Sequence, residues 1–259
     1  MKQSLNNMTD LLNLKGRTYI ITGAASGIGK ALSQILSELE ARLLLIDINE
    51  DGLHKLQESL PTESDILILD LTQTDSIKGL IKAKVDTFGK LNGFVHCAGI
   101  PYISPLKTVN TQKSESLYKL NTYAAIELAK VCSNKQIYAG EHGAFVLISS
   151  VYGLVGSAAN VVYAMSKGAI ISITKALAIE LAPKGIRINC VAPGFVKTSM
   201  MDTVSNSLDE SYIKTLESLH PMGLGEARAV AEPIAFLLSD AARWITGTVL
   251  SVDGGFTAQ

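Results

Sequence analysis

The sequence has little that would suit it to a nucleic acid or a membrane. Its 23 Lys and Arg residues are balanced by 24 Asp and Glu residues, and a formal net charge of −1 provides no basic surface. No uninterrupted apolar run reaches the roughly 20 residues of a membrane helix, although 47% of the residues are apolar. No repeat, low-complexity tract or linker divides the chain. We therefore expect residues 1–259 to form one domain, with neither nucleic acid nor a membrane among its partners.

Cysteine is also scarce. Cys97, Cys132 and Cys190 lack the spacing of metal ligands, so we predict no metal site. Residues 1–13 lack the basic region, apolar core and cleavage site of a secretory signal, and we expect them to form a loose leader. An odd number of cysteines without such a signal indicates reduced thiols, and hence a cytoplasmic location.

What the sequence does contain is a regular alternation of strand and helix patterns. Strand patterns fall at 17–22, 42–47, 65–69, 91–97, 143–149, 186–191 and 247–252, and helix patterns at 28–40, 50–59, 74–89, 111–138, 161–182 and 226–239. This alternation predicts an α/β fold of the Rossmann type, a doubly wound, seven-stranded parallel sheet with helices on both faces. The alternation stops at 199–224, which we predict to be a lid over substrate or a surface against another subunit.

A glycine-rich segment joins the first predicted strand to the first predicted helix. Gly23, Gly27 and Gly29 have the spacing Gly-x-x-x-Gly-x-Gly. Glycines permit a tight turn and close approach of the backbone to a phosphate, which the free N–H groups of a helix N-terminus attract. An ordinary turn would also use glycine, but the position between strand and helix favours a dinucleotide site.

The second predicted strand ends in a carboxylate. Asp47 follows Gly29 by 18 residues, close to the offset of about 20 expected for the acid that binds the adenosine ribose. A carboxylate there accepts hydrogen bonds from both ribose hydroxyls and repels a 2′-phosphate. No Lys or Arg lies in the glycine segment or directly after Asp47, so we predict NAD as the cofactor in preference to NADP. The alternative is an Asp that only opens the loop or caps the next helix.

A phenol and an ammonium are expected on one face of a later helix. Tyr163 and Lys167 are four residues apart, and the charge of Lys167 is expected to lower the pKa of Tyr163. Residues 144–148 have the pattern of a buried strand, which Ser149 and Ser150 follow. Because ligands of open α/β sheets bind at the carboxyl ends of strands, a hydroxyl, a phenol and an ammonium could converge there on one carbonyl group.

Together these motifs resemble the short-chain dehydrogenase/reductase family of the compact, single-domain type, over about Leu14–Phe256. The family spacing of thirteen residues before the tyrosine selects Ser150 as catalytic and leaves Ser149 as a structural hydroxyl. The resemblance implies the catalytic residues Asn121, Ser150, Tyr163 and Lys167. It implies cofactor contacts from Gly23, Ser26, Gly27, Ile28, Gly29, Asp47, Asp70, Leu71, Ala98, Gly99, Tyr163, Lys167, Pro193, Gly194, Val196 and Thr198. Substrate contacts are expected from Ser150, Tyr152, Tyr163 and Met200, with Tyr102, Val151, Val155 and Met201 as further candidates for a partly apolar pocket.

The chain departs from the family pattern at one place. Where the family has Asn-Asn before Ala-Gly, this chain has His96-Cys97. Cys97 cannot replace the amide that ties adjacent strands, so the bracing there is in question, although the backbone turn should survive. We interpret His96 as a hydrogen-bonded structural residue rather than a catalytic one, and Cys97 as a small buried thiol rather than a redox group.

The resemblance implies an NAD-dependent oxidoreductase that transfers hydride between nicotinamide and a secondary alcohol or ketone. Tyr163 would be the general acid and base, Ser150 would stabilise the oxygen, Lys167 would bind the nicotinamide ribose, and Asn121 would hold a relay water. The alternative within the family is a 3-oxoacyl thioester reductase acting on an acyl carrier protein, which the acid at position 47 and the near-neutral charge disfavour. A noncatalytic dinucleotide sensor is the alternative of another class.

The resemblance also implies a homotetramer, or at least a homodimer. The predicted helix 161–182 has apolar residues beyond those needed to cover a sheet, and the last predicted strand, 249–252, would be an exposed edge in a monomer. Family members pair such helices in one interface and the last strands in another. A monomer whose apolar helix faces all pack internally is the alternative.

Overall fold

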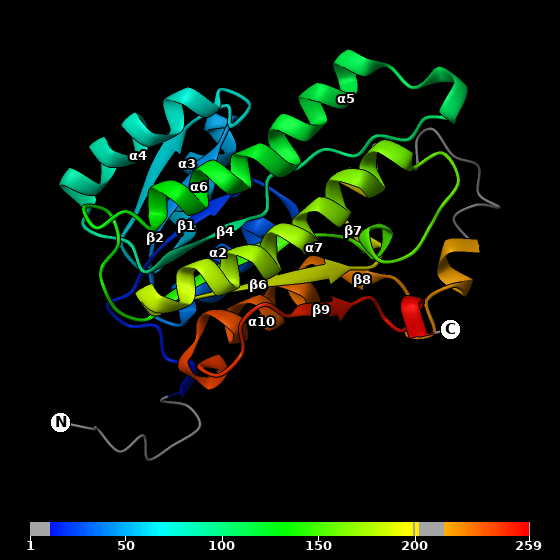
Figure 1. The fold of residues 1–259 in the computed structure, drawn as a ribbon. Helices are drawn as coiled ribbons and strands as arrows, with labels where there is room; N and C mark the ends of the chain where they lie inside the picture. Colours follow the sequence, from blue (N-terminus) through cyan, green and yellow to red (C-terminus); the bar gives the residue numbers. More distant parts are fainter. Residues whose placement is uncertain (1–10, 199, 202–214, 259) are drawn as a thin grey trace.

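The protein is described by a computed structural model for residues 11–198, 200–201 and 215–258. Its main element is a parallel sheet of seven strands in the order β3-β2-β1-β4-β5-β6-β9 (Figure 1). The strands are β1 (Thr18–Thr22), β2 (Arg42–Asp47), β3 (Ser64–Ile68), β4 (Gly93–His96), β5 (Gly143–Ile148), β6 (Ile186–Pro193) and β9 (Val249–Val252). The chain runs outward from β1 to β3 and then returns to β4, so the direction of winding changes between β1 and β4. The predicted doubly wound α/β fold is therefore confirmed.

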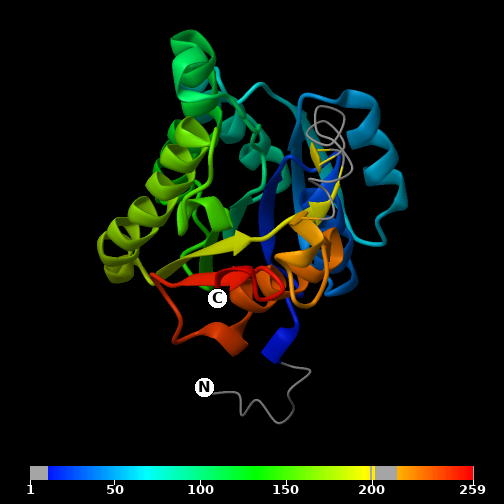
Figure 2. The same cartoon turned by 90° about the vertical axis from the view of Figure 1, so that its right-hand side faces the viewer.

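Helices cover both faces of this sheet because side chains alternate along each strand. Ile20, Leu44 and Ile46 face the layer of α4 (Thr74–Phe88), α6 (Ala124–Cys132) and α7 (Val161–Leu181). Tyr19 and Leu43 face the layer of α2 (Gly27–Glu38), α3 (Glu50–Ser59) and α10 (Ala227–Leu238). Figure 2 shows the green helices of the first layer and the blue helices of the second on opposite sides. The two apolar clusters hold all strand carboxyl ends at one edge.

One helix prediction was wrong, and one small sheet was not predicted. The helix expected at 111–138 is divided into α5 (Thr111–Tyr118), a π-helical turn η2 (Lys119–Tyr123) and α6, and it ends at Cys132. A π-turn is a single turn inside a longer helix, too short a stretch for the apolar periodicity to reveal it. Two short strands, β7 (Val196–Lys197) and β8 (Gly225–Glu226), pair in a second small sheet that two-residue segments do not announce in a sequence.

The predicted leader and lid lie largely outside the described residues. Of the leader 1–13, only its last residues are described, and Leu14, directly after it, is fully buried against the α2 layer. Of the lid 199–224, residues 200–201 and 215–224 are described, and Leu216 is buried. Where the rest of these segments lies stays a prediction.

One helix of the described residues, Val161–Lys184, is long and apolar enough to cross a membrane by length and composition. A single such helix is weak evidence, because the covering helix of a globular protein passes the same test. Here α7 packs on the sheet through Ile170, Ala178 and Leu181. Only 33% of its most apolar window is buried, so a large apolar face remains open in one copy of the chain.

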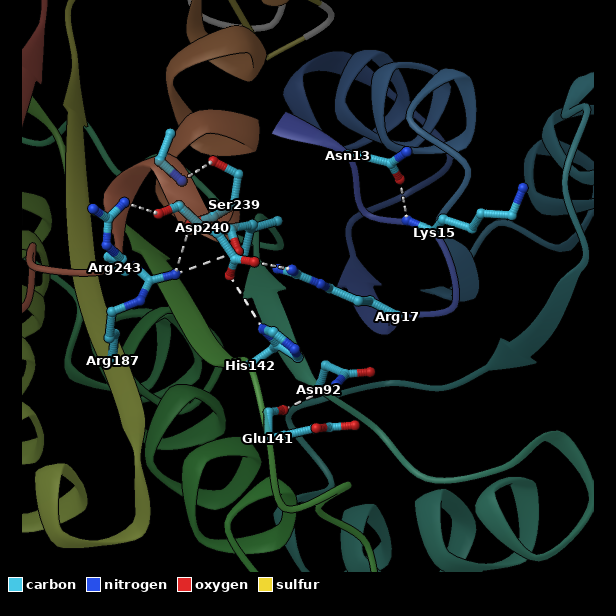
Figure 3. Close-up of polar contacts among 12 residues, drawn as sticks. Asn13, Lys15, Arg17, Asn92, Glu141, His142, Arg187, Ser239, Asp240 and Arg243 are labelled. Carbon is cyan, nitrogen blue, oxygen red and sulfur yellow. Dashed lines mark hydrogen bonds and ion pairs between the residues drawn. The ribbon is translucent and has the colours of Figure 1, made fainter. Parts of the chain in front are cut away.

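The opposite, amino edge of the sheet is closed by a polar network (Figure 3). Arg17, directly before β1, and His142, directly before β5, both point at the carboxylate of Asp240 after α10. Burial favours the neutral carboxyl, but the hydrogen bond from Arg17 and its charge hold the pKa of Asp240 below its usual value. Arg187 donates to the carbonyls of Leu237, Leu238 and Ser239, which end α10 without helical partners. The network fastens the C-terminal helix to the edge remote from the glycine turn.

Candidate active site

The glycine turn between β1 and α2 is folded too tightly for any other residue at two positions. A Cβ on Gly29 would lie 2.2 Å from the carbonyl oxygen of Gly23, and a Cβ on Gly23 would lie 2.8 Å from the amide of Ala98. Ser26, the N-cap of α2, makes no side-chain capping bond, and the first turn of the helix carries no acidic residue. The N–H groups and positive dipole end of α2 are therefore available to an anion.

Asp47 lies beside this turn. Its carboxylate accepts hydrogen bonds from the amides of Ala25 and Asn49, both at 3.0 Å, which aim it at the glycine turn. The next residue is Ile48, whose side chain is 71% exposed and carries no charge. Asp70, which follows β3, accepts bonds from the amide and hydroxyl of Thr72. The carboxylates of Asp47 and Asp70 therefore lie on the glycine-turn side of the candidate site, where the neighbouring lining residues at the ends of β2 and β3 are apolar.

Ser149 and Ser150 have different environments, as expected from strand alternation. Ser149 Oγ donates to the main-chain carbonyl of Lys167 at 2.7 Å, so this serine is a structural hydroxyl, as predicted. Ser150 begins the short helix η3 (Val151–Gly153), and its Oγ accepts a hydrogen bond from the amide of Tyr152 at 3.2 Å. Ser150 therefore retains a hydroxyl proton that can be donated to a ligand.

Tyr163 and Lys167 extend from α7 toward the end of β5. Lys167 is buried, and its Nζ donates to the carbonyl of Ile148 at 2.9 Å and lies 5.6 Å from the centre of the Tyr163 ring. Burial lowers the pKa of Lys167 to about 8. Burial raises the pKa of Tyr163 to about 12, and hydrogen bonding with Ser150 opposes this rise. The expectation that Lys167 lowers the pKa of Tyr163 was wrong, because desolvation of the phenol dominates.

Asn121 lies within the π-helical turn η2, next to the turn at Gly99 and Ile100. Its Oδ1 accepts from the amide of Ile100 at 3.0 Å, and its Nδ2 donates to the Ile100 carbonyl and to Ser166 Oγ. A Cβ on Gly99 would lie 3.1 Å from Asn121 Oδ1 and 3.6 Å from Lys167 Nζ. Asn121 therefore fixes the turn at Gly99–Ile100 against α7.

His96 supplies the bracing that Cys97 cannot. Its Nδ1 lies 2.9 Å from Thr22 Oγ1 at the end of β1, and its Nε2 lies 3.0 Å from the carbonyl of Leu120 in η2. The Thr22 hydroxyl oxygen also accepts from the Ala98 amide. Since Leu120 can only accept, Nε2 carries the proton and Nδ1 accepts from Thr22. His96 is thus the hydrogen-bonded structural residue that was predicted, and it joins β1, β4 and η2.

One cavity of about 380 Å³ brings most of the predicted site residues together. It is lined by every predicted cofactor residue and by Ser150, Tyr152, Tyr163 and Met200. Asn121 does not line it, and the further candidates Tyr102 and Val155 do not, whereas Val151 and Met201 do. Tyr102 instead accepts a hydrogen bond from the Asn110 amide beside a second, open hollow.

Sequence reasoning missed several lining residues, which are Ile100, Pro101, Ile103, Asn160 and Phe195, whereas Leu216 stands in the predicted lid 199–224. Phe195 stands within the Pro193–Thr198 segment and could have been included with it. Among the described lining residues, Lys167 is the only cation. In the same described part of the chain, no three His, Cys, Asp or Glu side chains gather in a way that could hold a metal ion.

Comparison with known proteins gives long matches. The profile of the family described as enoyl-(acyl carrier protein) reductase matches residues 23–257. The chain is 35% identical over 248 residues to a 3-oxoacyl-[acyl-carrier-protein] reductase of Thermotoga maritima, covering 94% of this chain and 99% of that one. It is 35% identical over 249 residues to a short-chain dehydrogenase/reductase of Botryotinia fuckeliana, covering 93% and 96%. A solved structure, a putative NAD(P)-dependent gluconate 5-dehydrogenase from Beutenbergia cavernae with bound NADP, has a TM-score of 0.90 at 28% identity, covering 96% and 100%.

The neutral, two-sided bond of His96 leads to a prediction about stability. Burial lowers the pKa of His96 to about 4 in the folded chain, against an ordinary value near 6.5 when unfolded. As pH falls below 6.5 the unfolded chain binds a proton that the folded chain does not, so stability falls, by roughly 3 kcal/mol in total by pH 4. His96→Asn should remove this part of the pH dependence and cost about 1–3 kcal/mol at pH 7.5, because a buried partner loses its hydrogen bond.

Urea unfolding of both proteins between pH 7.5 and 4.5 measures this effect. His54→Asn is the matched control, since His54 is exposed on α3 and its variant should keep the wild-type pH dependence. Equal pH slopes for wild type and His96→Asn would contradict the assignment.

Proposed function

We propose a reaction for this chain, which belongs to the short-chain dehydrogenase/reductase family: hydride transfer between NAD and an uncharged secondary alcohol or its ketone. The chain is an oxidoreductase of the type that acts on CH–OH groups with NAD(P). The observation that carries the finer proposal is a single cavity in which Ser150, Tyr163 and Lys167 meet the Gly23–Gly29 turn and Asp47.

The residues at one end of the cavity fit a nicotinamide dinucleotide. The glycine turn leaves no space for side chains where it folds back, and the uncapped N-terminus of α2 offers N–H groups to the pyrophosphate. Asp47 would accept from the adenosine ribose, and Asp70 with Leu71 would contact the adenine. Ala98, Gly99 and the Pro193–Thr198 loop would contact the nicotinamide half. NAD, when bound, supplies or accepts the hydride.

The chain's own groups perform the proton chemistry. Tyr163 donates a proton to the carbonyl oxygen during reduction and takes one from the alcohol during oxidation. Its pKa of about 12 keeps the phenol protonated at neutral pH, which suits reduction, so oxidation should be faster at higher pH. Ser150 hydrogen-bonds the same oxygen and stabilises its developing charge. Lys167, with a pKa of about 8, can exchange a proton near neutral pH and bind the nicotinamide ribose, while Asn121 holds the Gly99–Ile100 turn and, by resemblance to the family, would hold the relay water.

An uncharged substrate is supported by the wall around Ser150 and Tyr163. It is formed mostly by apolar side chains, those of Ile100, Pro101, Ile103, Val151, Phe195, Met200, Met201 and Leu216. Among the described lining residues, the carboxylate of an acidic substrate would meet no cation except Lys167. Burying an unpaired charge is costly, so acids should be poor substrates.

The competing function is reduction of 3-oxoacyl groups on an acyl carrier protein, which the name of the Thermotoga maritima relative favours. An absorbance assay of the reduced nicotinamide distinguishes the two, using uncharged secondary alcohols and ketones, sugar acids and an acetoacetyl thioester. We expect the best kcat/KM with an uncharged alcohol or ketone, and the highest value on the thioester would establish the competitor instead. Because Cys97, Cys132 and Cys190 are all unpaired, we further propose a reducing, cytoplasmic setting.

The cofactor preference gives a prediction about affinity. NADH should bind at least tenfold more tightly than NADPH, about 1.4 kcal/mol, because a 2′-phosphate would lie against the carboxylate of Asp47. Asp47→Ala should narrow this difference, and Asp75→Ala, on the first turn of α4 and outside the cavity, should not. Fluorescence titration with both reduced cofactors measures the affinities. Equal or tighter binding of NADPH to the wild type would overturn the preference, which the NADP-bound relative makes a real alternative.

Loss of the phenol should stop turnover and leave binding intact. Tyr163→Phe removes one hydroxyl, and kcat should fall by about 10²-fold or more because the general acid is gone. NADH affinity and the urea midpoint should stay near wild type. Tyr138→Phe is the matched control, since its hydroxyl lies near Gly143 at the amino end of β5. A Tyr163→Phe enzyme with more than about a tenth of wild-type kcat would show that another group transfers the proton.

We also propose that the chain forms a homotetramer, or at least a homodimer. The open face of α7 includes Val161, Met165 and Ile179, which is 79% exposed, and β9 is an edge strand of the sheet. Sedimentation equilibrium at micromolar concentration should give a multiple of the 27.6 kDa chain. Ile179→Glu should lower the average mass, and Leu106→Glu, equally open but on the short helix Leu106–Thr108, should not. A wild type that sediments as one chain would contradict the proposal.

A further inference from the structure

His220 is a buried residue that the catalytic scheme does not use. It is 3% exposed and lies where three segments meet. These are its own turn at 215–219, the Pro193–Thr198 loop, and the C-terminal turn that begins at Asp253. Two of the three reach the candidate active site, because Leu216 and Phe195 both line the cavity.

Both ring nitrogens of His220 are used, and their partners fix its protonation state. The main-chain N–H of Phe195 donates to Nε2 at 3.1 Å, so Nε2 carries no proton. Nδ1 lies 2.6 Å from the carbonyl oxygen of Leu216, which can only accept, so Nδ1 carries the proton. Only the neutral ring with its proton on Nδ1 satisfies both contacts.

The ring is also packed against the aromatic side chains of the site. It packs at a tilt of 39° against Phe256, with centroids 4.9 Å apart, and meets Phe195 edge-on at 5.6 Å. Tyr152, a candidate substrate residue, packs edge-on against Phe195 and Phe256 at 5.7 and 6.3 Å. A Cβ on Gly194 would lie 2.8 Å from His220 Nε2, so the loop approaches the ring as closely as glycine allows.

We propose that His220 is a positioning residue for the cofactor loop. Its unprotonated Nε2 holds the Phe195 amide, and with it the Pro193–Thr198 loop, in the place needed for the nicotinamide half of NAD. Protonation puts an N–H against the Phe195 N–H, removes the acceptor, and frees the loop, so NAD binding weakens in acid. This inference rests on the proposed function, since that loop is assigned to the cofactor there.

The charges around His220 belong to few groups. Asp253 faces it from the C-terminal turn, and its carboxylate is bound by the amides of Gly255 and Thr257 and by the Thr257 hydroxyl. Glu217, on the same turn as His220, is exposed, as are Lys197 on β7 and Glu226 on β8. Acid sensitivity of NADH binding that disappears in His220→Gln therefore points to His220 and not to these groups.

Two substitutions distinguish the role of the Nε2 hydrogen-bond acceptor of His220 from the role of its aromatic packing. In His220→Gln, the amide oxygen can accept from the Phe195 N–H and does not titrate near neutral pH. In His220→Phe, the ring packing is kept and the acceptor is lost. His54→Gln, on the exposed face of α3, is the matched control for removing a histidine.

NADH affinity of all four proteins is measured by fluorescence titration from pH 8 to pH 5.5, with urea unfolding to verify folding. We expect wild type and His54→Gln to lose about tenfold in affinity over this range. His220→Gln should keep its affinity throughout, and His220→Phe should be about tenfold weaker at every pH, since tenfold is about 1.4 kcal/mol, within the range that one hydrogen bond contributes.

A flat profile for wild type, or the wild-type slope in His220→Gln, would overturn the role of His220. If His220→Phe does not fold, the comparison of wild type with His220→Gln decides alone. If the wild type binds no NADH at every pH from 8 to 5.5, the proposed function is contradicted instead. Failure of the proposed function can therefore be told apart from failure of the role of His220.

Discussion

The candidate site depends on a pair of hydrogen bonds between α7 and the end of β5. Lys167 Nζ donates to the Ile148 carbonyl, and Ser149 Oγ donates to the Lys167 carbonyl. The helix and the strand are thereby joined in both directions at one residue. Ser150 follows Ser149 by one position, and Tyr163 precedes Lys167 by one helical turn, so the same two bonds set the positions of all three reactive groups. The ammonium is buried for this purpose, which lowers its pKa to about 8.

The remainder of the fold supports this contact between α7 and β5 from the two edges of the sheet, which are held in different ways. At the amino edge, Asp240 and Arg187 fasten α10 to the starts of β1, β5 and β6. At the carboxyl edge, side chains bond to main-chain groups of turns, as with Asn121 and Ile100 or His220 and Phe195. Turns held by one or two neutral hydrogen bonds can adjust to a ligand at little cost, whereas an ion network at the amino edge of the sheet resists movement. The division suits a site that must accept and release a cofactor.

Residues whose role follows from their position in a sequence motif could be predicted from the sequence. The strand–glycine–helix order marked the turn at Gly23, the offset marked Asp47, and the spacing to Tyr163 separated Ser150 from Ser149. What depends on the third dimension could not be. The rise in the pKa of Tyr163 comes from burial, which spacing from Lys167 does not report. The π-turn at Asn121 is too short to be seen in the apolar periodicity, and nothing in the sequence shows that both ring nitrogens of His220 are hydrogen-bonded.

The replacement at Cys97 has a consequence for how the protein meets oxidants. The thiol lies in the cavity wall, and burial raises its pKa to about 12, so the thiolate is very rare at pH 7. Burial likewise raises the pKa of Cys190 to about 11 and that of Cys132 further. Peroxides and alkylating reagents attack thiolates, so these three sulfurs are chemically quiet. A sulfur in the wall of the candidate site is thereby kept in its less reactive thiol form.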